Sequence, residues 1–441
     1  MMELIIKAYL AFVAALSEQT VWDFLLVFFP LILLIELPYY VVLLIAATGA
    51  YVQELFSRPQ TAAYRPYITC LLTCYDEGDN VQRTLKSLRE QLYRGQIEVL
   101  VIIDGAEVNQ ETVQAAQKFV RDHRGKSNIH FRVIPKRLRG GHASSINLGL
   151  KLAKGEVIVT LDGDCSCDND MVQAVAQAFT DPNVIGMSGT LRLRNAKQNL
   201  LTRLQGIEFM IGIHFARLAL GQLNSLNNIS SAFGAFRRDF LYKIGGWKNG
   251  SGEDFDITIR LRAYFKRYPH MKLVHNKDAV VHTDGPSTWR GLLKQRLRWD
   301  GDIYYIACSR HWRAIRPKFL GWLGFFGFMW DLLLLHMILP FSLILGLTFL
   351  CVFYAWSYVL FILGVTYLYY LVVSAVMFIF YWLLVSERKR YDLQFVPYLL
   401  FKPFYHLVLR MWSAVALLSE IILKTHRDSP MAPAWVNRKV D

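Results

Sequence analysis

The segment EVIVTLDGD, residues 156–164, places an apolar stretch directly before two aspartates, Asp162 and Asp164. An apolar run of this length that ends in polar residues predicts a buried β-strand. In an extended backbone, side chains at positions i and i+2 point the same way, so the two carboxylates share one side. Two like charges there favour a divalent cation such as Mg²⁺ or Mn²⁺, held together with a diphosphate. A solvated turn or a helix cap is the alternative interpretation.

Strand and helix patterns alternate around this segment. Such alternation is typical of an α/β fold with a parallel sheet. Ligands of such sheets bind beyond the carboxyl ends of the strands. The segment 74–77, Asp104 and Asp162 all follow predicted strands, so the sequence predicts one site at this edge. Strands are predicted over residues 67–73, 97–103, 130–134 and 156–161, and helices over residues 80–91, 111–123 and 144–153.

The composition indicates a membrane protein. The chain has 441 residues, of which 54% are apolar and 19% charged, too apolar a balance for an ordinary soluble protein. Residues 21–52 and 320–385 are nearly free of charge, and about 20 apolar residues span a bilayer as a helix. The net charge of +14 comes from basic residues that are dispersed or flank the apolar runs. This pattern fits membrane orientation and anionic headgroups better than nucleic acid.

The apolar runs contain a few informative exceptions. Pro38 predicts a kink in the first long run, and a charged Glu36 beside it should face protein or water. Residues 320–356 hold either one helix or a tight pair hinged at Pro340. The six cysteines form no CxxC pair, and no histidine cluster has zinc spacing, so we expect free thiols in a reducing cytosol.

A second acidic pair, Glu253 and Asp254, follows Gly252 and opens a predicted helix over residues 255–263. Carboxylates are favoured at helix N-termini for structural reasons alone, so capping is one interpretation. The other is a general base that takes a proton from a hydroxyl group. Asp254 is our candidate for that base, and Glu253 is expected to shape the site.

Residues 289–306 predict an amphipathic, basic and aromatic helix that lies on a membrane surface. Within it, Gln295, Arg298 and Trp299 lie at positions i, i+3 and i+4 and therefore share one face. Arg298 can form charge-assisted bonds to a diphosphate, and Trp299 offers a flat face for a sugar ring. A juxtamembrane anchor is the alternative, because Arg and Trp are enriched there.

Together these residues resemble the membrane-embedded family 2 inverting glycosyltransferases, the branch that includes cellulose, hyaluronan, chitin and poly-N-acetylglucosamine synthases. The resemblance runs from about residue 67 to residue 299 and rests on the DxD, acidic-pair and QxxRW elements. It implies an α/β GT-A (Rossmann-like) catalytic domain inserted between N-terminal and C-terminal transmembrane helices, with interfacial amphipathic helices. Residues 234–238 and 294–299 look most like poly-β-1,6-N-acetylglucosamine synthases.

The resemblance also implies a role for individual residues. The residues implied for catalysis are Asp254, Glu253 and Asp164. The residues implied to bind the metal, Mg²⁺ or Mn²⁺, are Asp162 and Asp164. The residues implied for the nucleotide sugar are Tyr75, Glu77, Asp104, Asp162, Gln295, Arg298 and Trp299. Those implied for the acceptor are Ser231, Phe233, Gly234 and Trp299.

Several positions depart from the family pattern. Gly252 stands where the family has the threonine of its "TED" element, and His142 stands at the lysine of "GK". The family's "YNE" is Tyr75-Asp76-Glu77, and the segment after Trp299 is unusually acidic. These departures leave the metal pair, the base and the QxxRW residues in place.

The predicted organisation has five parts: N-terminal membrane helices (1–55), a cytosolic GT-A domain (56–286), amphipathic interface helices with QxxRW (287–318), C-terminal transmembrane channel helices (319–426) and a C-terminal tail (427–441). We expect an integral protein of the plasma (inner) membrane. Its expected partners are a UDP-sugar, the growing polysaccharide and the lipid bilayer, but not nucleic acid. A small accessory membrane subunit is a further partner that the resemblance allows.

The predicted function is a polysaccharide synthase that transfers a sugar, with inversion, from a UDP-sugar to a β-linked polymer and secretes that polymer through its own helices. UDP-N-acetylglucosamine is the favoured donor. Alternatives are a β-glucan synthase that uses UDP-glucose and a non-processive transferase that acts on a lipid-linked acceptor. A membrane transporter or scaffold with an inactive transferase-like domain is the alternative from another class.

Overall fold

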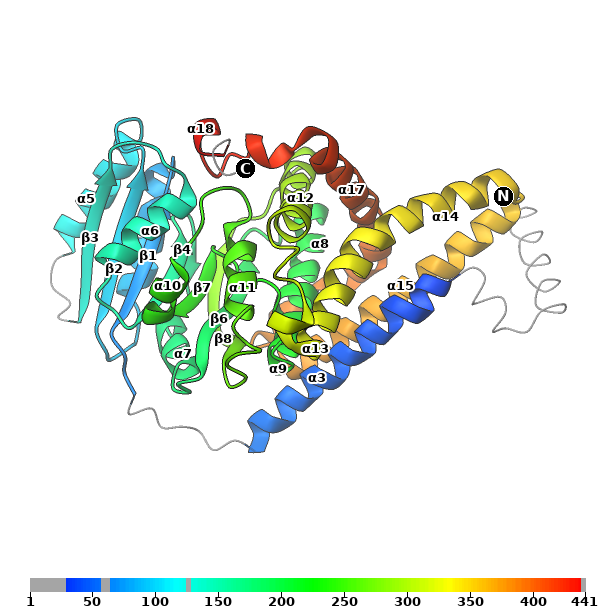
Figure 1. Cartoon of the computed structure of the whole chain (residues 1–441), viewed down its shortest axis with the longest axis horizontal. Coiled ribbons are helices and arrows are strands. Elements are labelled where there is room, and N and C mark those ends of the chain that lie inside the picture. The colour runs from blue at the N-terminus through cyan, green and yellow to red at the C-terminus, as the bar shows by residue number, and fades with distance from the viewer. Residues whose placement is uncertain (1–28, 57–63, 124–127, 438–441) are drawn as a thin grey trace.

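The computed structural model describes residues 29–56, 64–123 and 128–437. An eight-stranded sheet in the order β3-β2-β1-β4-β7-β6-β8-β5 forms the left-hand part of the molecule in Figure 1. The strands are β1 (Ile68–Cys74), β2 (Ile97–Asp104), β3 (Ile129–Lys136), β4 (Val157–Asp162), β5 (Ser166–Cys167), β6 (Val184–Leu193), β7 (Phe233–Arg237) and β8 (Lys272–Thr283).

The sheet is mixed rather than parallel. Strands β3, β2, β1 and β4 run parallel, as the strand–helix alternation predicts. Strand β7 then lies antiparallel between β4 and β6. The prediction of a parallel sheet is therefore wrong at β7 and β5, which pair antiparallel with their neighbours, whereas β6 and β8 pair parallel.

Helices cover both faces of the sheet because alternate strand residues point to opposite sides. In β1, Cys70 and Leu72 belong to one core with α4 and α7, whereas Leu71 belongs to a second core with α6, α10 and α11. These helices are α4 (Val81–Arg89), α5 (Gln110–Asp122), α6 (His142–Leu152), α7 (Met171–Ala178), α8 (Leu200–Phe209), η3 (Met210–Phe215), α9 (Ala216–Gln222), α10 (Arg238–Ile244) and α11 (Glu253–Arg262).

Four helical segments in the described part of the chain are long and apolar enough to cross a membrane: Ile32–Phe56, Pro317–Phe353, Trp356–Leu384 and Lys389–Leu423. Segment Pro317–Phe353 is one continuous helical segment and not a pair hinged at Pro340, which lies in the first turn of a continuing helix. Its break lies instead at Gly321, where φ is 72°. The first part of the predicted N-terminal membrane helices, residues 1–28, lies outside the described residues. The elements are η1 (Ile32–Glu36), α3 (Leu37–Phe56), α12 (Trp289–Tyr304), η4 (Tyr305–Arg310), α13 (Pro317–Phe328), η5 (Met329–Ile338), α14 (Leu339–Phe353), α15 (Trp356–Leu384), α16 (Lys389–Asp392), η6 (Leu393–Phe401), α17 (Lys402–Leu423), η7 (Thr425–Asp428) and α18 (Ala434–Asn437).

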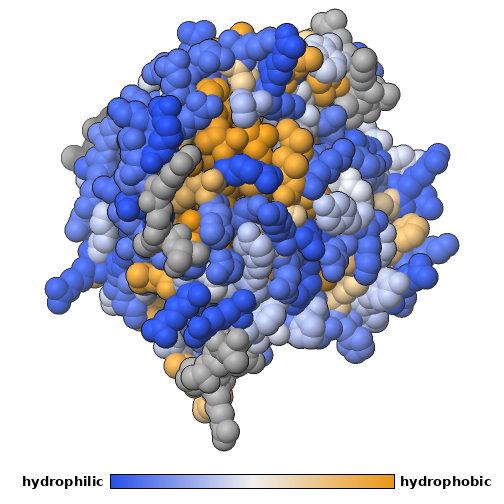
Figure 2. All heavy atoms as spheres, turned by 90° about the vertical axis from the view of Figure 1, so that its left-hand side faces the viewer, coloured by the Kyte–Doolittle hydropathy of each residue, from blue (hydrophilic) through white to orange (hydrophobic). Residues whose placement is uncertain are grey.

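Helices α3, α14 and α15 project together away from the sheet (Figure 1). The opposite end of the molecule presents a largely hydrophilic surface around one apolar patch (Figure 2). The acidic residue in the first span faces protein, as predicted. Glu36 is fully buried, 2.8 Å from the guanidinium of Arg410, and accepts a hydrogen bond from Tyr370.

The sheet and the apolar helices share one core. Leu43 of α3 and Met377 and Phe378 of α15 belong to the same buried cluster as the residues of β1 and β4. A polar clamp reinforces this junction. Arg192 of β6, whose side chain is 5% exposed, lies 2.6 Å from Glu387 and 2.9 Å from Asp392. The sheet is therefore fixed to the turn that follows α15.

We expect Arg192→Met to lower the stability of the protein by about 3 to 5 kcal/mol, because it leaves the buried Asp392 carboxylate without its cation. The thermal midpoint in detergent measures this loss. Arg137→Met is the matched control, since its side chain is 83% exposed and pairs with Glu107 at the surface. We expect this control substitution to lower the stability of the protein by less than about 1 kcal/mol. Equal shifts in the two variants would contradict a structural clamp.

Candidate functional site

A cavity of about 240 Å³ opens at the carboxyl ends of β1, β2 and β4. We call it the acidic pocket. The structure brings together there the five residues that the sequence predicts at this edge, and adds a histidine. Its lining includes Tyr75, Glu77, Asp104, His142, Asp162 and Asp164.

The carboxylates of the acidic pocket are crowded. A Cβ on Gly163 would lie 2.8 Å from both Cys74 Sγ and Glu77 Cγ, so the turn between the two aspartates requires glycine. Burial and the nearby Asp164 carboxylate raise the pKa of Glu77 to about 7. Burial and Asp162 likewise raise the pKa of Asp164. A bound cation would relieve this repulsion.

The acidic pocket suits a divalent ion that is shared with a ligand. No three His, Cys, Asp or Glu side chains in the described ranges form a group that would hold a metal by themselves. Mg²⁺ in proteins commonly takes one or two carboxylates and completes its shell with phosphate oxygens and water. Asp162 and Asp164 fit that donor set, and oxygen ligands suit Mg²⁺ and Mn²⁺ alike.

Asp104 organises a glycine loop. Its carboxylate accepts hydrogen bonds from Lys136 Nζ at 2.7 Å and from the backbone N–H groups of Gly140 at 3.0 Å and Gly141 at 2.8 Å. Gly141 has φ of 90°, and a Cβ there would lie 2.5 Å from Ala432, so this position also requires glycine. Because protein donors occupy the carboxylate, its contact with a nucleotide stays a prediction.

The segment 429–437 lies against the acidic pocket, where Pro430 and Met431 form part of its lining. The backbone N–H of His142 donates to the carbonyl of Met431 at 2.9 Å, and Arg139 donates to the carbonyl of Pro430 at 2.9 Å. The Arg139 guanidinium also lies 3.9 Å from the centre of the Tyr75 ring, a residue that the resemblance assigns to the nucleotide sugar. Sequence reasoning missed Arg139 and the segment 429–437 because a short irregular segment carries no periodic signal.

His142 joins the acidic pocket to the second acidic pair. Its Nδ1 lies 2.8 Å from Glu253 Oε1, and its Nε2 lies 2.9 Å from Thr73 Oγ1 and 3.4 Å from Asp162 Oδ1. Burial alone would lower the pKa of His142, but hydrogen bonds to Asp162 and Glu253 raise it to about 10. The ring is therefore a cation between two carboxylates. The only sequence signal for this role is the departure from the family's lysine at this position.

Glu253 and Asp254 begin α11 and differ in their surroundings. Burial opposes the ionisation of Glu253, yet the hydrogen bond from His142 holds the pKa of that carboxyl below its ordinary value. Ser231 Oγ also donates to Glu253 at 3.1 Å. Burial and the charge of Glu253 raise the pKa of Asp254. Asp254 is thus the stronger base of the two, as a proton acceptor requires.

Gly252 explains one departure from the family pattern. Its φ is 70°, and a Cβ there would lie 3.0 Å from Ile306 and 3.1 Å from the Cβ of Asp302. A threonine at this position would therefore be both strained and crowded. The acidic segment after Trp299 occupies the space that a side chain at Gly252 would need.

Helix α12 presents Gln295, Arg298 and Trp299 on one face, as their spacing predicts. Arg298 Nη1 lies 4.0 Å from Asp302 Oδ2. Burial raises the pKa of Asp302 to about 8. The Arg296 guanidinium lies 4.5 Å from the centre of the Trp299 ring. One side of that ring is therefore covered by a cation, and its contact with a sugar stays a prediction.

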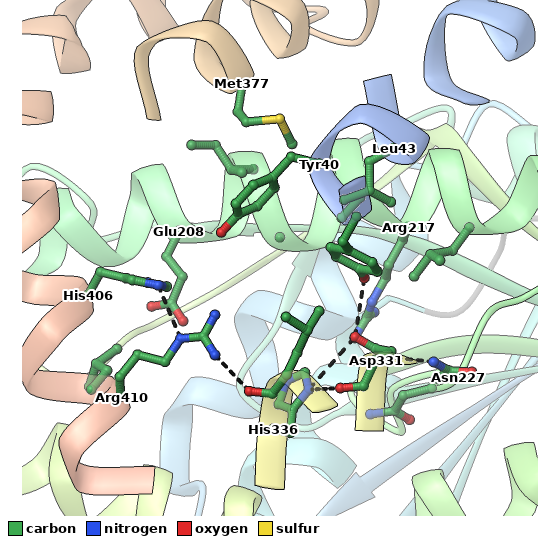
Figure 3. Close-up of a pocket in the computed structure, with 18 of the residues that line it drawn as sticks. Tyr40, Leu43, Glu208, Arg217, Asn227, Asp331, His336, Met377, His406 and Arg410 are labelled. Carbon is green, nitrogen blue, oxygen red and sulfur yellow. Dashed lines mark hydrogen bonds and ion pairs between the residues drawn. The ribbon is translucent and has the colours of Figure 1, made fainter. Parts of the chain in front are cut away.

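A second cavity, of about 400 Å³, begins beside Asp254 and extends between the apolar helices. We call it the inner cavity. Asn228, whose Nδ2 lies 3.4 Å from Asp254 Oδ2, forms part of its lining. Figure 3 shows Arg217 of α9, Asn227 of the loop before β7, Asp331 and His336 of η5, and Arg410 of α17 directed toward it. Its walls come from α3, α8, η3, α9, α11, α12, η5, α15 and α17.

The predicted acceptor residues divide between two environments. Ser231 lies against Glu253 and so belongs to the site. Phe233 and Gly234 lie within β7, where the Phe233 side chain is fully buried. Phe233 therefore supports the strand beneath the site rather than presenting a surface to an acceptor.

Comparison with known proteins agrees with this geometry. Residues 69–245 match the model of glycosyl transferase family 2. Poly-beta-1,6-N-acetyl-D-glucosamine synthase of Staphylococcus epidermidis is 27% identical over 252 residues, which cover 57% of this chain and 58% of that protein. The synthase of Staphylococcus aureus strain MSSA476 is 28% identical over 233 residues, 53% of each chain. The chain thus spans little more than half the length of these relatives.

The glycosyltransferase domain has a GT-A-like fold. The solved structure of mannosyltransferase PcManGT from Pyrobaculum calidifontis, in complex with GDP-Man and Mn²⁺, aligns with a TM-score of 0.52 at 18% identity. The alignment covers 88% of this chain and 99% of that one. The likeness therefore extends over the curled mixed sheet and beyond it.

We expect Mg²⁺ to raise the thermal midpoint more at pH 8 than at pH 6. The pKa of Glu77 is raised to about 7, so its ionisation destabilises the fold as the pH rises through that value, and a bound cation offsets the cost. The added shift should be about 2 to 4 °C, as ~1 kcal/mol produces in a domain of this size. Glu77→Gln should flatten the difference between the two pH values. An equal Mg²⁺ effect at both values in the unaltered protein would contradict the argument.

Proposed function

We propose that the protein transfers a sugar, most readily N-acetylglucosamine, from a UDP-sugar to the end of a β-linked polysaccharide and passes the polymer into its membrane helices. The observation that carries the proposal is the link between its two acidic groups. His142 joins the acidic pocket, which suits a metal and a diphosphate, to the helix that bears Asp254. A donor in the acidic pocket and an acceptor beside Asp254 would therefore meet.

In the proposed reaction, Asp254 takes the proton of the acceptor hydroxyl. The freed oxygen attacks the anomeric carbon from the side opposite UDP, and the bond to UDP breaks in the same step, which inverts the configuration. His142 holds a positive charge next to Asp162, and Arg298 adds another near the acidic pair. A divalent ion bound by Asp162 and Asp164 would supply further neutralisation of the leaving diphosphate.

The inner cavity supports a route for the polymer. It starts at the proposed base and is walled by α3, η5, α15 and α17, which all belong to candidate membrane spans. Its charged lining residues include both signs, with Arg217, Lys402 and Arg410 as well as Glu208 and Asp331. A lining of mixed charge suits an uncharged glycan better than one of a single sign would. In this proposal the protein lies in the inner membrane, with its glycosyltransferase domain on the cytosolic side.

The relatives support N-acetylglucosamine as the sugar, since their names describe synthesis of poly-β-1,6-N-acetylglucosamine. The mannosyltransferase structure supports only the fold and the use of a divalent ion in that enzyme. A processive enzyme should make long chains, whereas a transferase for a lipid-linked acceptor would stop after one sugar.

The test is release of UDP by the purified protein in detergent with Mg²⁺ or Mn²⁺, over a panel of UDP-sugars. We expect release with UDP-N-acetylglucosamine, and loss of about 10²- to 10⁴-fold in Asp254→Asn, because the general base is removed. Asp239→Asn is the matched control, since this carboxylate is 87% exposed.

Each outcome has a clear meaning. Release with UDP-glucose alone would favour a β-glucan synthase. An unchanged rate in Asp254→Asn would refute the role of that residue. No release with any donor, in folded protein, would refute the transferase proposal.

A further inference from the structure

We propose that Asp331, in the apolar segment Pro317–Phe353, is a positioning residue for the acceptor, and that Asn228 contacts the acceptor directly. The inference rests on the proposed function and deepens it. It concerns the wall of the inner cavity to which η5, the loop 223–232 and Phe255, the residue after Asp254, contribute. Figure 3 shows Asn227 and Asp331 of this wall joined by a dashed line.

The amide of Asn227 is held between an anion and a cation. Its Nδ2 donates to Asp331 Oδ2 at 2.6 Å, and its Oδ1 accepts a hydrogen bond from Arg262 Nη1. Because Arg262 fixes the oxygen and Asp331 fixes the nitrogen, the amide has one permitted orientation. Arg262 lies on α11, the helix that begins with Glu253 and Asp254. Asn227 thereby fixes the spacing between the membrane helix and the helix that carries the base.

The next residue, Asn228, extends this link to the base. Its Nδ2 lies 3.4 Å from Asp254 Oδ2, and the residue lines the inner cavity. Its Oδ1 is buried and has no hydrogen-bond partner within the described part of the chain. Buried acceptors without a partner are rare and costly. A hydroxyl or acetamido N–H of a sugar beside Asp254 would supply the missing donor.

Asp331 has the contacts that a fixed anchor needs. The hydroxyl of Tyr39 donates to its Oδ1 at 3.2 Å, and His336 Nδ1 lies 3.7 Å from the same oxygen. Carboxylates are costly in membrane segments unless they face protein and serve a purpose. The carboxylate therefore joins α3, η5 and the loop 223–232 at one point, and a shift of either helix would move Asn228.

Exchanging the two side chains tests this pair. Asn227→Asp places two carboxylates against each other, and Asp331→Asn removes the negative charge to which the Asn227 amide donates. The double variant Asn227→Asp/Asp331→Asn restores the pairing with donor and acceptor reversed, while the carboxylate introduced at position 227 still accepts from Arg262. The double-mutant cycle therefore isolates the contact from each residue's other interactions.

Two readouts separate positioning from general damage. One is sugar incorporated into a short β-linked oligosaccharide, and the other is UDP released by water alone. We expect each single variant to lower incorporation about tenfold, as loss of a charged hydrogen bond produces, with UDP release by water and donor KM little changed. The exchanged double variant should recover incorporation to within about threefold of the unaltered protein. This remaining difference is smaller than the loss of one hydrogen bond would cause.

Tyr39→Phe is the matched control, because it removes a hydrogen bond from the same carboxylate and leaves the Asn227 contact intact. It should lower incorporation far less than Asp331→Asn. Near-normal incorporation in both single variants, or no recovery in a folded double variant, would overturn the proposal.

Asn228→Ala tests the acceptor contact without altering either Asn227 or Asp331. We expect the acceptor KM to rise about tenfold, with donor KM unchanged, because a single hydrogen bond to the acceptor is lost. An unchanged acceptor KM would overturn the role of Asn228. If the unaltered protein releases no UDP from any donor, the proposed function itself has failed, and that result is distinct from every outcome above.

Discussion

Two acidic regions of the site depend on one imidazole ring. Asp162 and Glu253 would repel each other across a buried boundary if no cation lay between them. His142 supplies that cation, and the two carboxylates keep it charged by raising its pKa to about 10. The contact couples β4 to α11. The His142 contacts therefore determine how far the Asp162–Asp164 pair lies from the helix that carries Asp254.

The remainder of the fold holds this coupled site against the apolar helices. The core of the sheet continues into α3 and α15, and Arg192 clamps β6 to the turn after α15. The segment 429–437, which follows α17, lies against the acidic pocket. The site is thus bounded by segments that precede and segments that follow the candidate membrane helices in the sequence. These contacts couple the position of the site to the position of those helices.

The sequence predicts the strands β1 to β4, the acidic edge and helix α12, because each depends on local spacing or on where a strand ends. It also predicts that Glu36 faces protein, since a charge in lipid is costly. It does not predict β7 as an antiparallel strand, the contacts of the segment 429–437, or the pairs Arg192–Asp392 and Asn227–Asp331. These features join residues that lie far apart in the chain, and no local pattern encodes their partners.

One measurement tests the central claim most directly: UDP released and sugar incorporated into polymer, counted in the same reaction with a labelled UDP-sugar. The account predicts one sugar incorporated for each UDP released, in a product whose linkages are all β by NMR, because attack opposite the leaving group inverts the anomeric carbon. UDP release without incorporation, or a product with α-linkages, would contradict a site in which Asp254 directs an acceptor at a donor held in the acidic pocket.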